Sequence, residues 1–532
     1  MKTASQRLVR VPVFTAALLA STLLSPLAFA QDNLPTGAKI VSGDATVSTH
    51  GTAMEIDQRS QKLITNWQSF SIGPDNTVIF RQPNEQAIAL NRVIGQDPSR
   101  VLGNLIANGK VFLINPNGIV FGPGGSVQSG GFVGSTLNLS DADFLRGEYR
   151  FTGTMGTIVN EGSLRGGVIA LISPIVSNQG TITGDTALAA GSDVILDFDG
   201  DGLLAVEVSA STLATLVEND GLIQAEGGVA ILTAKGANDA LRGVVNNTGV
   251  IEARSIAAKD GRILLLGDMD HGEVHASGSL EASFVETSAK SVTIDDGLVV
   301  QTQGGEWLID PNDFTIAASG GNISGAALSN NLANGNVTIT TASQGTPGGN
   351  GDIFVNDTVT WAANTLTLRA DRDININTEM FGSGTAGLAL EYAQTDDSGD
   401  YFVNAPVNLA STGSFSTKKG TDATINYTII TSLGAEGSTT GTDLQGINGN
   451  PSGNYALGAD VNASETVDWN NGLGFLPLGG DDFSGNFDGL GHSIANLHIN
   501  RGPTEMIPGE NDVGLFGHVF GGSIQNIHIR GG

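Results

Sequence analysis

Residues Lys110 to Gly125 read KVFLINPNGIVFGPGG, and this stretch decides how the chain is expected to fold. Two short apolar runs with β-branched residues, Val111 to Ile114 and Ile119 to Phe121, are typical of strands. Between them, Pro116 fixes φ near the value of a turn's second residue, and Asn117-Gly118 tolerates the positive φ of a tight reversal. The stretch therefore predicts a rigid strand–turn–strand unit. Turn chemistry by itself says nothing about a partner.

A pattern of asparagine, any residue, glycine and then apolar positions recurs further along the chain. It reads IVNEGSL, IVSNQGTI, LVENDGLI and VVNNTGVI, which places Asn160, Asn178, Asn219 and Asn247 at equivalent positions. One such coil cannot bury its apolar face alone, but coils stacked about 4.8 Å apart can. Asparagines in equivalent turns can exchange amide hydrogen bonds, as in cross-β ladders. The sequence therefore predicts stacked coils of β-strands held by an asparagine ladder.

Three motifs in one region carry a resemblance to a known family. They are NWQSFSI (Asn66 to Ile72), LNRV (Leu90 to Val93) and the FLINPNGI-x-FG run. From about Gly37 to about Gly267, the chain resembles the N-terminal secretion domain of two-partner secretion exoproteins, the filamentous haemagglutinin family. In that family the domain is a right-handed parallel β-helix. The POTRA domains of a partner outer-membrane transporter recognise it in the periplasm. The family's second motif, NPNL, is replaced here by Ser173-Pro174-Ile175-Val176.

The resemblance implies an all-β fold, a right-handed parallel β-helix with an N-terminal cap and small β excursions. It gives Asn115, Pro116, Asn117, Gly118 and Ile119 a role in secretion, either in transporter recognition or in building the first rung. Trp67 and Phe70 are expected to fill one end of the core, because a terminal rung leaves an open edge. Pro98 to Ala107 has helix-like spacing and is expected to form a short helical or irregular excursion. Ser319 to Asn331 is expected to be a loop.

Four segments are expected along the chain. Residues 1–30 have the basic start, apolar run and Ala28-Phe29-Ala30 cleavage site of a signal peptide. Residues 31–267 would be the secretion domain. Residues 268–440 would continue the β-helix with Gly- and Asn-rich loops, and they contain the WLIDPNDFTI run common after such domains. Residues 441–532 carry the paired runs SIANLHI and SIQNIHI, and a GLFG that resembles the GLUG motif of bacterial surface proteins. Because the chain stops after a strand-like run without a cap, we expect a fragment of a longer exoprotein.

The composition excludes several classes of function. The chain has 74 glycines in 532 residues and only 15% charged residues, which suits many short strands with frequent turns. Its net charge of −29 repels nucleic acid, so we expect no nucleic-acid partner. There is no cysteine, which excludes disulfides, thiol catalysis and thiolate metal sites.

Two kinds of side-chain cluster could carry chemistry. Asp197 to Gly202 (DFDGDG) starts like an EF-hand loop, but the twelfth position is Val208 rather than a bidentate glutamate, so a solvated turn is favoured. Acidic pairs such as Asp371 and Asp373, Asp396-Asp397 and Asp481-Asp482 arise by chance in so acidic a chain. His498 and His528 occupy equivalent repeat positions and are expected to lie one above the other as outward-facing strand residues. We therefore expect no catalytic residue, no metal and no cofactor.

These observations favour a secreted, non-enzymatic β-helical exoprotein that reaches the cell surface through the periplasm. Its N-terminal third would address the chain to the POTRA/β-barrel transporter. The remainder would be a surface rod or adhesin for a host-cell or carbohydrate receptor. Two alternatives stay open from the sequence, a β-helical polysaccharide-active enzyme and the stalk of a larger toxin.

Overall fold

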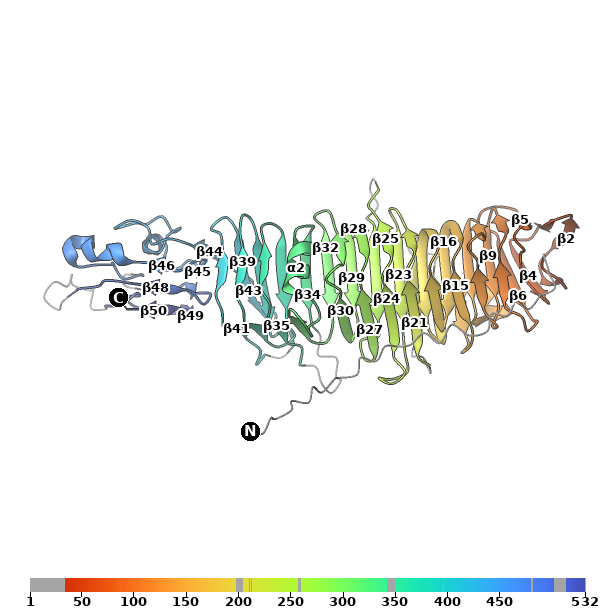
Figure 1. Cartoon of the computed structure of the whole chain (residues 1–532). Helices are drawn as coiled ribbons and strands as arrows, with labels where there is room; N and C mark the ends of the chain where they lie inside the picture. The colour runs from red at the N-terminus through yellow and green to blue at the C-terminus, as the bar shows by residue number, and fades with distance from the viewer. Residues whose placement is uncertain are drawn as a thin grey trace, which may run out of the picture.

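The computed structural model describes residues 34–197, 204–209, 211, 213–256, 260–341, 350–395, 397–479, 482–501 and 513–531. Within these residues the chain winds into one long rod, with its first coils at one end and its last repeats at the other (Figure 1). The all-β parallel β-helix predicted from the sequence is confirmed. The expected signal peptide and most of the DFDGDG run lie outside the described residues.

The first of three sheets along the rod is entirely parallel and has eight strands. Each strand supplies one coil, and alternate residues point inward, as period two requires. Its strands are β7 (Ser99–Val101), β10 (Ile119–Phe121), β15 (Thr157–Asn160), β17 (Ile175–Asn178), β21 (Thr215–Asn219), β24 (Gly243–Asn247), β27 (Gly272–Ala276) and β30 (Ser291–Ile294).

The second and third sheets are joined, because β16 (Ser163–Ser173) and β18 (Thr181–Ala190) bend and run through both. The second sheet continues with β3 (Ala53–Gln58), β5 (Thr77–Arg81), β8 (Asn104–Ala107), β11 (Ser126–Gln128), β22 (Leu222–Gln224), β25 (Val250–Ala253), β28 (Ser279–Ala282) and β31 (Val299–Gln301). The third contains β4 (Lys62–Trp67), β6 (Ile88–Val93), β9 (Lys110–Ile114), β12 (Gly131–Ser135), β23 (Val229–Ala234), β26 (Arg262–Gly267), β29 (Phe284–Ser288), β32 (Glu306–Asp310), β34 (Asn336–Thr340), β37 (Thr365–Arg369), β40 (Gly387–Tyr392) and β43 (Ser414–Lys419).

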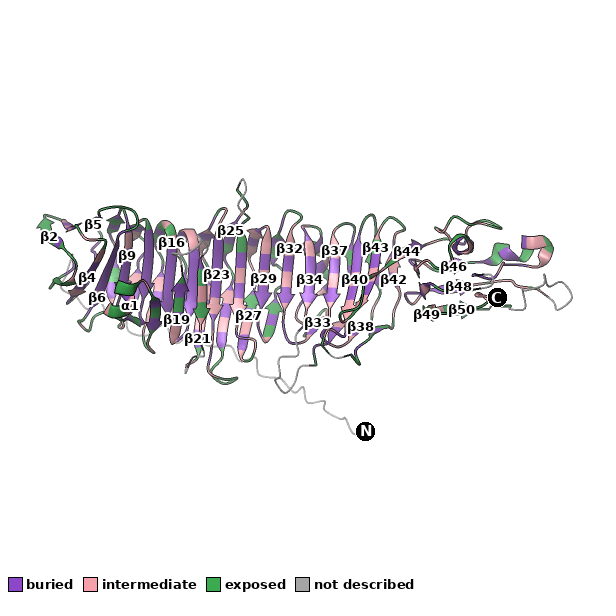
Figure 2. Ribbon diagram, turned by 180° about the vertical axis from the view of Figure 1, so that it is seen from behind, coloured by how far each residue is buried: buried purple, intermediate pink, exposed green. Residues whose placement is uncertain are grey.

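Two antiparallel strands cap the N-terminal end. β1 (Lys39–Ser42) pairs with β4, and β2 (Ala45–His50) pairs with β3. Trp67 and Phe70 are buried inside the first coils, with their rings in edge contact at 5.4 Å. The indole nitrogen of Trp67 donates to Asn91 Oδ1 at 3.0 Å, so this large side chain is buried without an unpaired N–H. One apolar core then runs from these coils along the rod, and the strands lining it carry buried residues, purple in Figure 2, along its length.

Outside the rod wall, one excursion makes a second core. The excursion contains the short helix α1 (Asp141–Arg146) and an antiparallel sheet. The strands of this sheet are β13 (Asn138–Leu139), β14 (Tyr149–Thr152), β19 (Asp193–Asp197) and β20 (Ala205–Val208). It covers outward-facing apolar residues of the third sheet such as Phe112, whose ring meets that of Tyr149 at 5.3 Å. Lys62 Nζ donates to the carbonyls of Phe144 and Leu145 at the end of α1. The excursion is therefore packed onto the rod.

The wall changes near residue 300. α2 (Gly325–Leu332) comes after β32 and β33 (Phe314–Ile316) in the chain and packs against β31, and two new parallel sheets take over from the first and second. Asn331 of α2 accepts from Val300 N and donates to Leu298 O, so the helix is bonded to the last coil before it. The new sheets contain β33 (Phe314–Ile316), β35 (Ile353–Val355), β38 (Ile374–Ile376) and β41 (Tyr401–Val403), and β36 (Val359–Trp361), β39 (Met380–Gly382) and β42 (Val407–Leu409).

Larger coils form the C-terminal end. β44 (Ile425–Ile430) pairs antiparallel with β43, and the coils after it return to parallel pairing. They contain β45 (Tyr455–Leu457), β46 (Val461–Asn462), β47 (Asn486–Asp488), β48 (Ser493–Ala495), β49 (Ser523–Gln525) and β50 (His528–Arg530), and 3-10 turns at Gln445–Gly449 and Ser464–Gly472.

Three expectations from the sequence were wrong. Pro98 to Ala107 contains two strands, β7 and β8, because its apolar residues alternate between inward and outward across a tight corner. The expected loop at Ser319 to Asn331 contains most of α2. His528 lies opposite Ser493 rather than His498, because SIQ pairs with NFD of the preceding coil, one strand away from its sequence repeat.

Candidate functional site

The turn at Asn115 to Gly118 is a corner of the coil. Gly118 N donates to Asn115 O at 3.0 Å and closes the turn. β9 pairs with β6 and β12 in the third sheet, whereas β10 pairs with β7 and β15 in the first. The order strand, turn, strand is therefore present. The two strands do not pair with each other, so the turn carries the chain from one face to the next rather than reversing it.

Asn115 ties this corner to the coil before it. The side chain is completely buried. Its Nδ2 donates to Asp97 O at 2.9 Å and to Ser99 Oγ at 3.0 Å, and both partners belong to the preceding corner. Its Oδ1 accepts from the backbone N and the side-chain Nδ2 of Asn117, each at 3.0 Å. One amide thus forms hydrogen bonds with its own turn and with the neighbouring coil at the same time.

The other motif residues divide between solvent and core. Gly118 has φ +118, and an added Cβ would lie 3.3 Å from Thr157 O in the next coil. Asn117 is exposed and also donates to Gly95 O at 3.0 Å. Pro116 is half-buried, and Ile119 lies in the core. In the folded domain, solvent therefore reaches only Asn117 and part of Pro116.

The corner two coils further on contains Ser173 and Pro174, where the family's second motif would be expected. Ser173 is completely buried. Its hydroxyl accepts from Thr136 Oγ1 at 2.8 Å and donates to Gly156 O at 3.1 Å. Hydroxyl groups thus replace the amide here, and each of these corners is satisfied by a different set of buried polar side chains.

Four buried asparagines line the interior corner between the first and second sheets. Nδ2 of Asn160, Asn178 and Asn219 each donates to Oδ1 of the next asparagine, at 2.7 Å in all three cases. At one end, Asn160 Oδ1 accepts from Gly162 N at 3.2 Å. At the other end, Asn247 Nδ2 donates to Ser277 O at 2.9 Å. The ladder is therefore closed by backbone groups at both ends.

On the outside of the same region, charged residues join successive coils. Arg254 contacts Glu226, Glu252 and Glu281, which lie on three different coils, at 2.6, 3.1 and 3.3 Å. All three carboxylates would repel one another without this guanidinium. The arrangement places one cation where three coils need a counter-charge.

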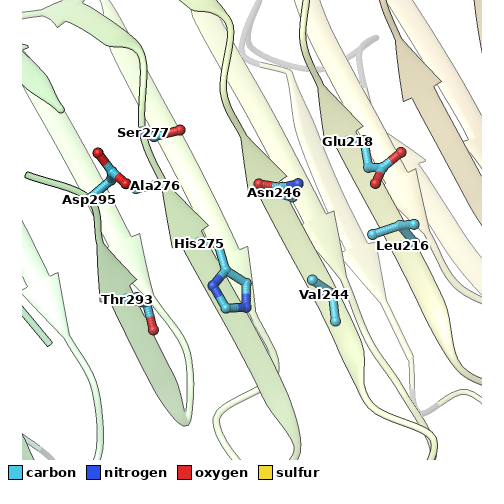
Figure 3. A pocket seen from close by; sticks show the side chains of 9 residues that line it. All are labelled: Leu216, Glu218, Val244, Asn246, His275, Ala276, Ser277, Thr293 and Asp295. Atoms are coloured by element: carbon cyan, nitrogen blue, oxygen red, sulfur yellow. The ribbon is translucent and has the colours of Figure 1, made fainter. Parts of the chain in front are cut away.

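A shallow hollow lies on the outer face of the first sheet, over β21, β24, β27 and β30 (Figure 3). Glu218, Asn246 and His275 are neighbours in register across it. Leu216 and Val244 form an apolar row beside them. Burial, and then the charge of Asp220, raises the pKa of Glu218.

The described part of the chain contains no group of three or more His, Cys, Asp or Glu side chains placed to hold a metal ion. The DFDGDG run, Asp396 and Asp481 lie largely or wholly outside it. Asp371 is buried and accepts a hydrogen bond from Thr395 Oγ1. No helix among the described residues is long and apolar enough to cross a bilayer.

Sequence reasoning missed a polar cluster inside the core, where the C-terminal coils meet the rod. The buried carboxylate of Asp488 accepts from the hydroxyl of Tyr401, from Gln525 Nε2 at 3.1 Å, from Asn526 Nδ2 at 3.0 Å and from Leu490 N at 2.8 Å. Burial raises the pKa of Asp488, and the four donors oppose that rise. No sequence signal could have found this cluster, because Tyr401 and Asp488 are 87 residues apart.

Comparisons with known proteins agree with this geometry. Residues 30–282 match the family model of the TPS secretion domain. The chain is 32% identical over 275 residues to the heme/hemopexin-binding protein of Haemophilus influenzae (strain ATCC 51907), across 49% of this chain and 30% of that protein. A second heme/hemopexin-binding protein of Haemophilus influenzae is 29% identical over 334 residues, 56% of this chain and 36% of the relative. The chain thus spans about a third of the length of these relatives.

The crystal structure of the HMW1 secretion domain from Haemophilus influenzae has the same fold. It superposes with a TM-score of 0.52 at 23% identity, covering 72% of this chain and 100% of that one. Residues 30–282 are therefore a TPS secretion domain, built as a parallel β-helix. The family match over these residues supports a two-partner secretion exoprotein. The relatives and structural neighbours are secretion domains and exoproteins rather than enzymes.

Proposed function

We propose that the TPS domain directs this chain through a partner transporter with POTRA domains, and that the Asn115–Ile119 corner is the element this step needs. The observation that carries the proposal is the position of Asn115. Its buried amide bonds two successive coils near the start of the stack. The corner therefore has to form early if coils are to be added in order from the N-terminal cap.

The burial of the motif supports recognition of an extended chain. In the folded domain Asn115, Gly118 and Ile119 are hidden, so the POTRA domains would have to contact them before the coil closes. Strand addition with pockets for alternate side chains is an established way to bind an extended segment. A signal peptide at residues 1–30 would first deliver the chain to the periplasm.

Folding outside the cell would give the transport its direction. Each coil buries its apolar face against the coil before it, and this makes withdrawal through the pore costly. The rest of the rod, with its larger C-terminal coils, would then display an adhesive or receptor-binding surface. The relatives' names refer to heme and hemopexin, but this chain spans only about a third of their length. We therefore leave the receptor's chemistry open between host-cell and carbohydrate targets.

The test is secretion of Asn115→Ala and Asn117→Ala variants, singly and together, in cells that express the partner transporter. We expect less protein outside the cell for Asn115→Ala and for the double variant. Asn246→Ala is the matched control, because Asn246 lies on the outer surface of β24. We expect this variant to be secreted normally. Normal extracellular amounts of the double variant would refute the role of the corner.

A second measurement separates recognition from folding. Each variant is refolded from urea as the purified chain, and its thermal stability is compared with that of the unmodified protein. If Asn117→Ala refolds with full stability but is not secreted, the exposed part of the motif is read by the transporter. If secretion falls only in variants that also lose stability, the corner acts by starting the fold.

A further inference from the structure

A second corner of the rod has the sequence Asp310-Pro311-Asn312, which resembles Asn115-Pro116-Asn117 with an acid in the first place. It lies between β32 and β33, where the first sheet of the rod is replaced by a new one. In the earlier corner, the amide of Asn115 donates to the preceding coil and accepts within its own turn. An ionised Asp310 can accept but has no hydrogen to donate.

Two oxygens of this corner are buried without a hydrogen-bond partner. They are Asp310 Oδ1 and Asn312 Oδ1. Asn312 is only 7% exposed, so water reaches its amide poorly. A buried polar atom without a partner destabilises the fold, and two in one turn call for an explanation.

A second carboxylate lies beside them. Ser288 is the register partner of Asp310 on β29, and its hydroxyl donates to Glu286 Oε1 at 2.8 Å. The register therefore places Asp310 beside Ser288, whose hydroxyl is bonded to Glu286. Burial, followed by the charge of Glu286, raises the pKa of Asp310 to about 6. The basic residue nearest in sequence, Lys290, is engaged with Asp239 at 2.7 Å instead.

We propose that this corner binds a divalent cation of the calcium type, held by Asp310, Asn312 and Glu286. Ca²⁺ takes carboxylate and amide oxygens as ligands and completes its shell with carbonyls and water. Among the residues that the structure describes, neither Asp310 nor Glu286 forms an ion pair, so with the Asn312 amide they supply such a ligand set. The ion would neutralise the two like charges and fill the unpaired valences of both buried oxygens. It would join the coil of β29 to the coil of β32 at the place where the wall changes.

This site is independent of the export step, so it can be tested on the purified chain. Thermal unfolding is measured at pH 7.5 after removal of divalent ions, then with increasing CaCl₂. MgCl₂ at equal ionic strength serves as the electrostatic control, because Mg²⁺ demands a stricter octahedral shell and gives up its water reluctantly. We expect Ca²⁺ to raise the Tm in a saturable way by about 2–4 °C, and Mg²⁺ to raise it less.

Asp310→Asn is the decisive variant. It keeps the size of the side chain and restores the donor that Asn115 has, so it should fold and should lose the response to Ca²⁺. The exposed turn residue Asp75 supplies the control, and Asp75→Asn should respond like the unmodified chain. Titration calorimetry should give a binding step that Asp310→Asn removes.

Three results would overturn the assignment. The first is no rise in Tm with Ca²⁺. The second is an equal rise in Asp310→Asn, which would mean diffuse binding to an acidic chain. The third is a Tm that rises on acidification from pH 7.5 to 5.5, without a response to Ca²⁺. That result would mean that Asp310 and Glu286 share a proton instead of a metal ion.

Discussion

Replacing Asn219 by alanine should destabilise the coils on both sides of it. The change removes two hydrogen bonds of 2.7 Å and leaves Asn178 Nδ2 and Asn247 Oδ1 without their partners. The two groups that lose their hydrogen-bond partners belong to fully buried residues. Each unpaired buried group costs about 1–3 kcal/mol, so the local loss should be about 2–6 kcal/mol.

Hydrogen exchange measures this loss better than a global melt. A stacked array contacts only its neighbours, so it opens coil by coil, and a single free energy of unfolding is poorly defined. We expect the amides of β17, β21 and β24 to exchange about 30-fold to 20,000-fold faster, since every 1.4 kcal/mol is a factor of ten. Amides of β6 and β40, far along the rod, should keep their rates.

Asn246→Ala is the control for this experiment. Asn246 is on the same strand as Asn247, but it faces the outer hollow and has no place in the ladder. Its replacement should change exchange rates by less than about threefold, as for most surface substitutions. If Asn219→Ala changes the rates no more than Asn246→Ala does, the ladder contributes nothing to stability and the reasoning fails.

Other perturbations test the remaining contacts. Tyr401→Phe removes a hydrogen-bond donor from the buried carboxylate of Asp488 and raises the pKa of Asp488 further. A carboxyl whose pKa is higher in the folded than in the unfolded state loses stability as the pH rises, so the Tm of the variant should fall below that of the unmodified chain by more at pH 8 than at pH 4. An equal fall in Tm at both pH values would contradict this. Arg254→Ala should lower the Tm at low salt, and the difference should shrink at 1 M NaCl, where charges are screened within about 3 Å. Gly118→Ala should cost about 1–3 kcal/mol in the local opening free energy of β9 and β10, measured by hydrogen exchange, because φ is +118. Gly124→Ala should cost less, because an added Cβ there would meet its nearest atom at 3.5 Å, an ordinary contact.

Local patterns allowed much of the rod to be predicted. The Asn-x-Gly turns mark four successive coils, since glycine or asparagine suits the corner and the apolar residues after it point inward. The stretch at Lys110 to Gly125 gave both strands and the turn between them. These patterns did not show in which direction the chain continues after each turn. The turn was expected to reverse the chain, but a corner between two faces uses the same turn residues.

The missed features depend on distant residues. Pro98 to Ala107 looked helical or irregular because Val101 and Leu105 are four apart, a spacing that a strand, corner and strand produce equally well. The excursion sheet was expected only in general terms, because Tyr149 pairs with Leu196 across two whole coils. The division of the chain at 267 and 440, and the GLUG character of the last repeats, stay predictions.

The hydrogen-bonded ladder also explains why asparagines occupy core positions where apolar residues could pack. The coils between them have unequal lengths, with steps of 18, 41 and 28 residues. A parallel strand that slips by two residues still presents its apolar face inward, so burial alone does not fix the register. The amides of the ladder do fix the register, because a slipped strand would leave Asn160, Asn178, Asn219 or Asn247 buried without a hydrogen-bond partner. The asparagines thus set the register of coils whose loops differ in length.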